Sequence, residues 1–308
     1  MRCHMKNIVL YIITVLIWGS TWFAIEFQLG EVAVEVSLFY RFGLAALIMW
    51  GYCLWKKIPL TFSLKNHGYI ILLGLGNFSA NYAILYYAQN YLNSAMTSIA
   101  FSTLLLMNIV NTRIFFGKPI AFRIYLGALL GLIGIVTLFW DELGVVNFSN
   151  GTIWGLALAL IGALVASFGN MVSVRNSNSE LNILAVNAWG MSYGTILLMI
   201  YAFLNGSEFN FSFEPSYIIS LLYLALFGSV IAFATYFSLL KNMGAEKASY
   251  LIILFPIVAV VLSSLFEDFE FTDNIIIGFI LVLIGNAIVL TPKEKLKMAY
   301  QKIMIVIK

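Results

Sequence analysis

The chain has 308 residues, of which 62% are hydrophobic and only 10% are charged, with a formal net charge of +3 and a mean hydropathy of +0.95. Soluble globular domains carry about 25% charged residues, so the composition excludes an ordinary soluble domain and indicates an integral membrane protein. The two cysteines and two histidines have no metal-type spacing, and they support neither a disulfide framework nor a zinc site.

Apolar runs recur along the whole chain. A charge-poor run of about 20 residues crosses the hydrocarbon core as a helix, and a helix satisfies its own backbone polar groups in lipid. The runs are rich in aromatic residues and lack strict alternation, which argues against a transmembrane β-barrel. We expect an all-α protein with ten transmembrane helices, at 7–27, 36–55, 68–90, 94–116, 122–140, 151–174, 182–204, 215–240, 245–266 and 274–291.

The basic residues predict the orientation of these spans. With the N terminus in the cytoplasm, 16 of the 17 Lys and Arg residues lie on the cytoplasmic side, and the remaining one, Arg41, lies inside a span. Cytoplasmic loops carry an excess of Lys and Arg, and an even number of spans returns the C terminus to the cytoplasm. The tail 293–308 alternates apolar residues with lysines at helical spacing. It is either a short amphipathic helix on the inner leaflet or a disordered basic tail.

In the first span, Trp18, Thr21 and Trp22 share one helical face. Aromatic rings with polar tips that faced lipid would sit at the level of the headgroups, so we expect this face to border a water-filled cavity. Ordinary helix packing through Gly19 and Ser20 is the alternative. The run is too long for a cleavable signal peptide, and we expect it to remain in the mature protein.

The second span contains Arg41. A charge at mid-depth costs on the order of 3 kcal/mol unless it is paired or hydrated. Glu26 lies at a similar depth on the neighbouring antiparallel span, so we expect an Arg41–Glu26 ion pair. This pair is either a structural clamp or part of a site in which the arginine meets a substrate carboxylate or phosphate. Since no other carboxylate lies deep in a span, strong coupling of function to an ion is not expected, although a proton could still use Glu26 or Glu35.

Amide and aromatic side chains recur at helical spacing in the third, fourth, sixth, seventh and eighth spans. Buried amides need hydrogen-bond partners, so these faces should point into the bundle. Packing between helices explains many of them as well as a cavity does. The predicted cavity residues are Trp18, Thr21, Trp22, Arg41, Asn77, Asn81, Asn108, Trp189, Tyr193 and Tyr236.

The two halves of the chain resemble each other. Glycines recur at the same separation in the fifth and tenth spans, at Gly127 and Gly134 and at Gly278 and Gly285. Each half has five spans, an odd number, so the second half is expected to be inverted relative to the first. The expected units are a first repeat at 1–140, a second repeat at 141–292 and the tail at 293–308.

Motifs spread over nearly the whole chain resemble the EamA-like branch of the drug/metabolite transporter superfamily. They are Trp18-Gly19-Ser20-Thr21-Trp22, Arg41-Phe42, Gly244-Ala245 with Ala248, Pro256, and Glu270-Phe271-Thr272. The resemblance implies inverted halves that rock around a central cavity, with Pro256 as a hinge. Leu106 stands where the family usually has the proline that corresponds to Pro256, so we expect the first half to lack a proline kink.

The resemblance implies a secondary transporter in the cell inner membrane, an exporter of small metabolites such as amino acids. The alternatives are a transporter of phosphorylated or nucleotide-linked metabolites and a non-transporting receptor or assembly protein. An enzyme is not expected, because both histidines lie outside the spans and leave a nucleophile without a base. The expected partners are a small-molecule substrate and the lipid bilayer, with no cofactor, metal or nucleic acid. Gly127 and Gly131 form a small-xxx-small pair that suits either a homodimer or packing within one bundle.

Overall fold

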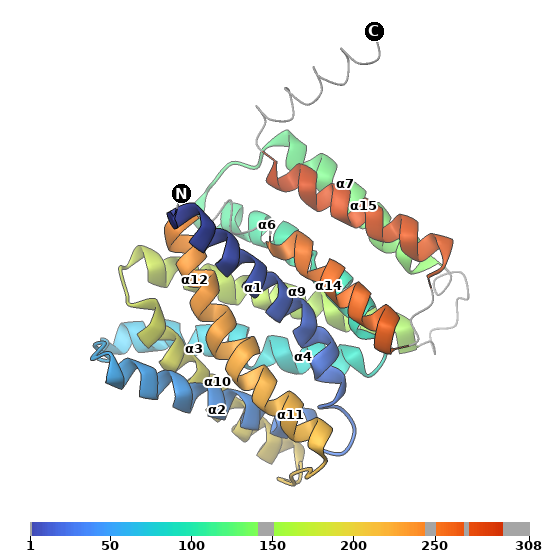
Figure 1. Cartoon of the computed structure of the whole chain (residues 1–308). Coiled ribbons are helices and arrows are strands. Elements are labelled where there is room, and N and C mark those ends of the chain that lie inside the picture. Colours follow the sequence, from blue (N-terminus) through green and yellow to red (C-terminus); the bar gives the residue numbers. More distant parts are fainter. Residues whose placement is uncertain (1, 141–150, 244–250, 268–270, 292–308) are drawn as a thin grey trace.

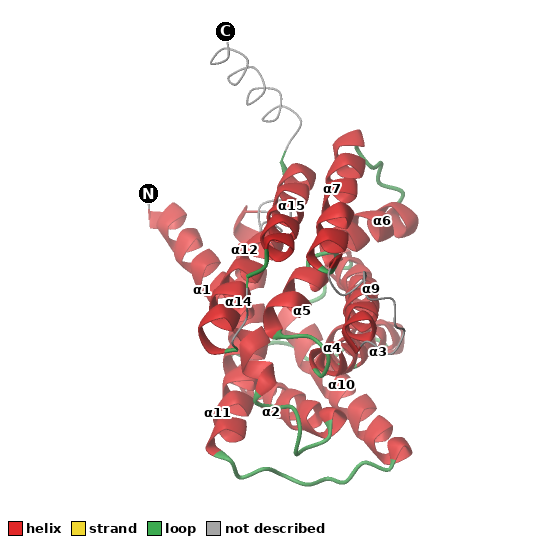
Figure 2. Ribbon diagram, turned by 90° about the vertical axis from the view of Figure 1, so that its right-hand side faces the viewer, coloured by secondary structure: helices red, strands yellow, loops and turns green. Residues whose placement is uncertain are grey.

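The computed structural model describes residues 2–140, 151–243, 251–267 and 271–291, and within these ranges the fold is entirely helical (Figures 1 and 2). The predicted tail at 293–308 lies outside the described residues. Of the predicted junction between the repeats, residue 140 is described and residue 141 is not. The first half contains α1 (Arg2–Glu26), α2 (Val34–Trp55), α3 (Leu64–Phe78), α4 (Ala80–Gln89), α5 (Ser94–Phe101), α6 (Leu104–Phe116) and α7 (Phe122–Leu138). The second half contains α9 (Gly151–Asn178), α10 (Ile183–Asn205), α11 (Pro215–Tyr223), the π-helix η1 (Leu224–Ile231), α12 (Ala232–Met243), α14 (Leu251–Phe266) and α15 (Asp273–Leu290).

The helices have the lengths that a membrane requires. Seven segments are long and apolar enough to span a membrane. Three of these segments combine consecutive helices: α3 with α4, α5 with α6, and α11 with the π-helix and the start of α12. Three further apolar helices, in α7, α14 and α15, are shorter. The chain is therefore a multi-pass membrane protein, as its composition predicts.

Local sequence explains several helix ends. The Asn93 side chain caps α5 by accepting the Met96 N–H at 2.9 Å, and Asn182 caps α10 in the same way. Gly117 and Gly206 end α6 and α10 in the left-handed region, with φ of 67° and 71°, which glycine adopts without steric cost. These ends fix where the chain turns back between helices.

Several of the long helices are irregular along their length. Ser79 separates α3 from α4, and the interval between α5 and α6 contains Ser102 and Thr103, whose hydroxyls donate to the carbonyls of Ile99 and Ala100. Such side-chain bonds compete with the helical ladder. The helix of the fourth apolar run, at 94–116, is thus interrupted between α5 and α6, although Leu106 stands where the family usually has a proline. By contrast, α14 continues through its internal Pro256.

The two halves interlock. Helix α1 packs against α12 and α14 of the second half, α9 packs against α3, α4 and α6 of the first half, and α2 packs against α10. Figures 1 and 2 show α7 and α15 side by side. A Cβ on Gly127 would lie 2.5 Å from the Gly285 oxygen, and one on Gly134 would lie 2.7 Å from the Gly278 oxygen. The repeated glycines therefore face each other within one chain and allow the two backbones to touch.

Candidate functional site

A cavity of about 170 Å³ lies between α1, α3, α4, α5, α6, α9, α12 and α14, so both halves contribute to its wall. The structure places most of the predicted cavity residues on that wall. They are Trp18, Thr21, Trp22, Asn77, Asn81, Asn108 and Tyr236. Other wall residues that the sequence did not single out include Tyr82, Phe101, Phe233 and Phe255.

Aromatic rings form one side of the cavity. Trp22 packs against Phe101 at a centroid distance of 5.2 Å and stacks on Phe255 at 6.1 Å. Trp18 contacts Phe233 at 5.6 Å and Tyr236 at 5.0 Å. Such pairs are stabilising in these geometries, and they hold the two indoles of α1 against helices of both halves.

A row of amides forms the other side. The Asn77 amide donates to Asn170 Oδ1 at 3.2 Å, and the Asn170 amide donates to Asn108 Oδ1 at 3.3 Å. One turn further along, the Asn111 amide donates to the Ser167 hydroxyl at 2.8 Å. The polar side chains that recur at helical spacing on α6 and α9 therefore meet each other, and the row links α3, α9 and α6 across the cavity wall. A wall of this kind offers hydrogen bonds without a fixed charge.

The wall on α3 and α4 is shaped by the break at Ser79. Asn77 belongs to α3 and Asn81 to α4, so the two amides do not share one continuous helix as their spacing predicts. Both still line the cavity. Asn81 is buried, and its Oδ1 atom has no hydrogen-bond partner.

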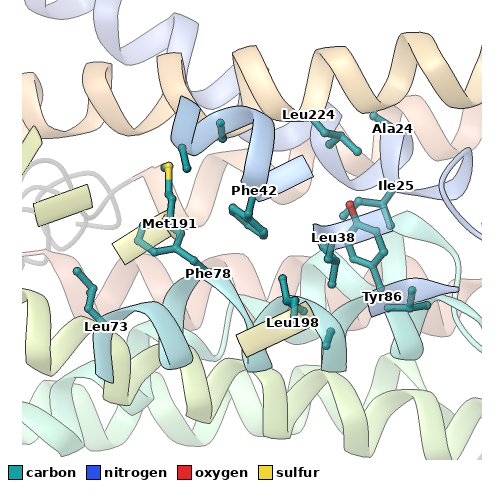
Figure 3. Close-up of a cluster of buried hydrophobic side chains, with 14 of the residues drawn as sticks. Ala24, Ile25, Leu38, Phe42, Leu73, Phe78, Tyr86, Met191, Leu198 and Leu224 are labelled. Atoms are coloured by element: carbon teal, nitrogen blue, oxygen red, sulfur yellow. The ribbon is translucent and has the colours of Figure 1, made fainter. Parts of the chain in front are cut away.

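Arg41 lies behind the cavity wall and is only 1% exposed. Its Nη1 donates to the Tyr86 hydroxyl at 2.9 Å, its Nε donates to the Ser229 hydroxyl at 3.4 Å, and its guanidinium lies 4.7 Å from the centroid of the Tyr82 ring. Tyr86 and Phe42, which both contact Arg41, belong to the cluster of buried side chains shown in Figure 3. The partners of Arg41 are neutral, and cation–π contact supplies part of its stabilisation.

The predicted Arg41–Glu26 ion pair is not formed. Glu26 instead accepts a hydrogen bond from the Gln89 amide at 2.6 Å. Similar depth in the membrane does not bring two side chains together when they leave their helices in different directions. In the described chain, Tyr86 holds the arginine and Gln89 holds the glutamate.

The π-helix brings the second half to Arg41. A Cβ on Gly228 would lie 2.8 Å from Thr21 Cγ2 and 3.4 Å from Arg41 Nη2, so only glycine leaves room for α1 and α2 here. The neighbouring Ser229 supplies the hydroxyl that Arg41 contacts. Segments of π-helix often occur at functional positions, and no simple sequence pattern predicted this eight-residue one.

Trp189 and Tyr193 do not line the cavity. Their rings stack on each other at 5.5 Å. The Trp189 indole donates to the Leu60 carbonyl at 2.8 Å, and the Tyr193 hydroxyl is 2.9 Å from His67 Nδ1. These contacts fasten the segment between α2 and α3, and the first turn of α3, to α10. The helical spacing correctly indicated a packed face, but not the cavity.

Pro256 is buried next to the cavity residue Phe255. Because proline has no N–H, the carbonyl of Ile252, one turn earlier, has no helical donor. Ile252 is itself a wall residue. The helical ladder of α14 therefore lacks one hydrogen bond at the cavity wall.

The sequence model of the EamA-like transporter family matches the chain twice, over residues 5–140 and 153–291. The chain belongs to this family. As an EamA-like protein, it is 25% identical to the uncharacterized transporter YoaV of Bacillus subtilis over 287 residues, which is 91% of this chain and 96% of the relative. It is 29% identical to the uncharacterized inner membrane transporter YedA of Escherichia coli K12 over 254 residues, which is 81% of this chain and 79% of the relative. A solved crystal structure shares the fold, with a TM-score of 0.66 at 17% identity, and covers 92% of this chain and 96% of the other.

Proposed function

We propose that this EamA-like protein is a secondary transporter that exports small metabolites such as amino acids by alternating access. The observation that carries the proposal is the cavity lined by helices of both halves, with α1 and α3 to α6 from the first half and α9, α12 and α14 from the second. A site between two similar bundles is opened to either side of the membrane when the bundles rock against each other. The break at Ser79, the π-helix and Pro256 are positions at which the surrounding helices deform with least loss of hydrogen bonding.

The proposed topology has ten spans in two inverted halves, 1–140 and 141–292, with both termini in the cytoplasm. The reciprocal packing of α1 into the second half and of α9 into the first half supports it. Helix ends with basic residues, such as Lys56 and Arg113, alternate along the chain with helix ends near acidic residues, such as Glu31 and Glu208, as the positive-inside rule requires. We place the protein in the cytoplasmic membrane, where its relative YedA is named as an inner membrane transporter.

The cavity favours a neutral or zwitterionic solute. Its wall, among the described residues, contains aromatic, aliphatic, hydroxyl and amide side chains and no charged one. Its volume of about 170 Å³ holds on the order of ten water molecules, which leaves room for a small amino acid. A phosphorylated or nucleotide-linked metabolite would need several basic side chains at the cavity wall. Arg41, the basic residue near the cavity, lies behind the wall residue Tyr82, so this class of substrate is less favoured.

The proposal is tested by thermal unfolding of the detergent-purified protein with a panel of amino acids, amines, nucleosides and sugar phosphates. A ligand at 100 times its Kd stabilises the folded state by about 2.7 kcal/mol. We expect stabilisation by one chemical class, its loss in Trp22→Ala, and its retention in Trp154→Ala, since Trp154 is 61% exposed on α9.

Counterflow in liposomes then decides whether the compound that binds is also moved. Uptake of labelled compound against preloaded unlabelled compound in the wild type, and its loss in Trp22→Ala, supports transport through the cavity. Binding without counterflow contradicts the transporter proposal.

A further inference from the structure

Arg41 is a buried cation that has no counter-anion within the described part of the chain. It is only 1% exposed, and its two hydrogen bonds go to the hydroxyls of Tyr86 and Ser229. Its guanidinium also lies over the Phe42 and Tyr82 rings, at 5.2 Å and 4.7 Å from their centroids. An arginine stays charged in proteins, and a charge within a membrane is costly unless an opposite charge or water meets it. The surroundings of Arg41 are therefore electrostatically incomplete.

The acidic residues on the helices around Arg41 do not supply the missing charge. Three of them, on α1, on α2 and just after α14, accept hydrogen bonds from other groups. Their donors are Gln89 for Glu26; Tyr87, Asn205 and Ser207 for Glu35; and the Ser94 N–H and the Ser263 hydroxyl for Glu267. None of these carboxylates pairs with Arg41, so the anion that completes its site comes from outside the described residues.

One ring separates Arg41 from the cavity. Tyr82 lines the cavity wall, and the guanidinium lies against this ring. The two hydrogen bonds of Arg41 use only two of the five donors of a guanidinium, and within the described chain Nη2 has no hydrogen-bond partner. A Cβ on Gly228 would lie 3.4 Å from this Nη2 and 2.8 Å from Cγ2 of the wall residue Thr21. The free end of the guanidinium therefore lies close to the cavity wall.

Tyr82 covers Arg41 by packing alone. Within the described residues its hydroxyl makes no hydrogen bond, unlike that of Tyr86, one turn further along α4. Its ring packs on Arg41 and, at a centroid distance of 4.9 Å, on Phe42. Tyr82 also stands in the first turn of α4, directly after the break at Ser79, where a helix has the fewest main-chain hydrogen bonds. Rotation of this ring breaks no hydrogen bond and uncovers the guanidinium.

We infer that Arg41 is the anion-binding group of the cavity, that Tyr82 covers it in the conformation described here, and that the substrate group it binds is a single carboxylate. A guanidinium matches the planar geometry of a carboxylate. One cation balances one negative charge, whereas a phosphate ester carries nearly two at neutral pH. The inference names the substrate class of the proposed transporter, and it rests on the proposed function in taking the cavity as the substrate site.

The cover is tested without a substrate, by reaction of the detergent-purified full chain with the arginine reagent phenylglyoxal. Mass spectrometry of the Arg41 peptide gives its rate of modification. We expect slow reaction in the wild type and severalfold faster reaction in Tyr82→Ala. Tyr125→Ala is the matched control, since Tyr125 is 58% exposed on α7, and Arg41 should react in it at the wild-type rate. If Arg41 reacts no faster in Tyr82→Ala than in this control, Tyr82 is not its cover and the inference is overturned.

The carboxylate is tested by thermal stabilisation with L-alanine, L-leucine and L-phenylalanine, each compared with its amide. The amide keeps the side chain and the ammonium group and lacks the carboxylate. In the wild type we expect at least one of these amino acids to bind about tenfold more tightly than its amide, a difference of about 1.4 kcal/mol. In Arg41→Met/Tyr86→Phe, which leaves no charge buried at this position, binding of the amino acid should fall to the level of the amide.

The matched control is Arg113→Met, because Arg113 is exposed near the end of α6. This variant should keep the preference for the carboxylate, and size-exclusion chromatography checks that each variant is folded. Equal loss of amino acid and amide binding in the double variant would show that Arg41 only supports the wall, which overturns the inference. So would equal affinities of amino acids and amides in the wild type, or the absence of stabilisation by any of these compounds.

Counterflow separates this inference from the proposed function. A compound that is transported without any preference for a carboxylate leaves the transport function standing and overturns the Arg41 site. A carboxylate that binds through Arg41 and shows no counterflow leaves the site standing and contradicts transport.

Discussion

Replacing Tyr86 with Phe removes one hydroxyl from a fully enclosed charged site. Tyr86 is 0% exposed, and its hydroxyl accepts a hydrogen bond from Arg41 Nη1 at 2.9 Å. The other hydrogen bond of the guanidinium, to the Ser229 hydroxyl, is longer, at 3.4 Å. A hydrogen bond to a charged group contributes about 1.5–3 kcal/mol, so we expect Tyr86→Phe to lower the free energy of unfolding by about 2 kcal/mol.

The measurement is unfolding in mixed detergent micelles with increasing SDS, followed by tryptophan fluorescence. Tyr125→Phe is the matched control, since Tyr125 is 58% exposed on α7 and its change should stay within about 0.5 kcal/mol. Arg41→Met in the Tyr86→Phe background should restore stability, because apolar packing replaces a buried charge without loss. Equal stabilities for Tyr86→Phe and Tyr125→Phe would refute the assignment of Tyr86 as the partner of Arg41.

Two further predictions concern packing. Gly285→Leu would place its Cβ 2.6 Å from the Gly127 oxygen, so we expect the free energy of unfolding to fall by about 1–3 kcal/mol and the unfolding temperature to fall with it. Gly68→Leu, with no neighbouring atom within 4 Å, should have little effect. Equal unfolding temperatures for the two variants would contradict the close contact of α7 and α15. Asn111→Leu should destabilise the protein less in a Ser167→Ala background than in the wild type. We expect a coupling energy of about 0.6 kcal/mol in a double-mutant cycle. Zero coupling would show that the 2.8 Å hydrogen bond between Asn111 and Ser167 does not contribute to stability.

The parts of the fold that follow from periodicity could be predicted from the sequence. The shared face of Trp18, Thr21 and Trp22 lines the cavity because three residues within one turn of helix cannot separate. The recurrence of Gly127 and Gly134 at the separation of Gly278 and Gly285 indicated a repeat, whereas the contact between Gly127 and Gly285 emerged only from the structure. The first of these inferences rests on local helix geometry that the bundle does not change.

The parts that depend on direction around a helix could not be predicted. Arg41 and Glu26 share a depth, but their partners are chosen by which side of each helix faces Tyr86 or Gln89. Trp189 and Tyr193 form a packed face, yet spacing alone does not say which neighbour it meets. Glu267 follows the end of a helix, next to acidic loop residues, so its sequence context is typical of an exposed charge rather than of a buried contact with another half.

Alternating access through the cavity is tested most directly by a single cysteine at its wall. In a chain with Cys3→Ser and Cys53→Ala, Thr21→Cys is exposed to a membrane-impermeant thiol reagent added to either side of oriented vesicles. The account predicts labelling from both sides, and protection from both sides by any compound that stabilises the protein. Labelling from one side only, or from neither, would contradict the proposal that this cavity opens alternately across the membrane.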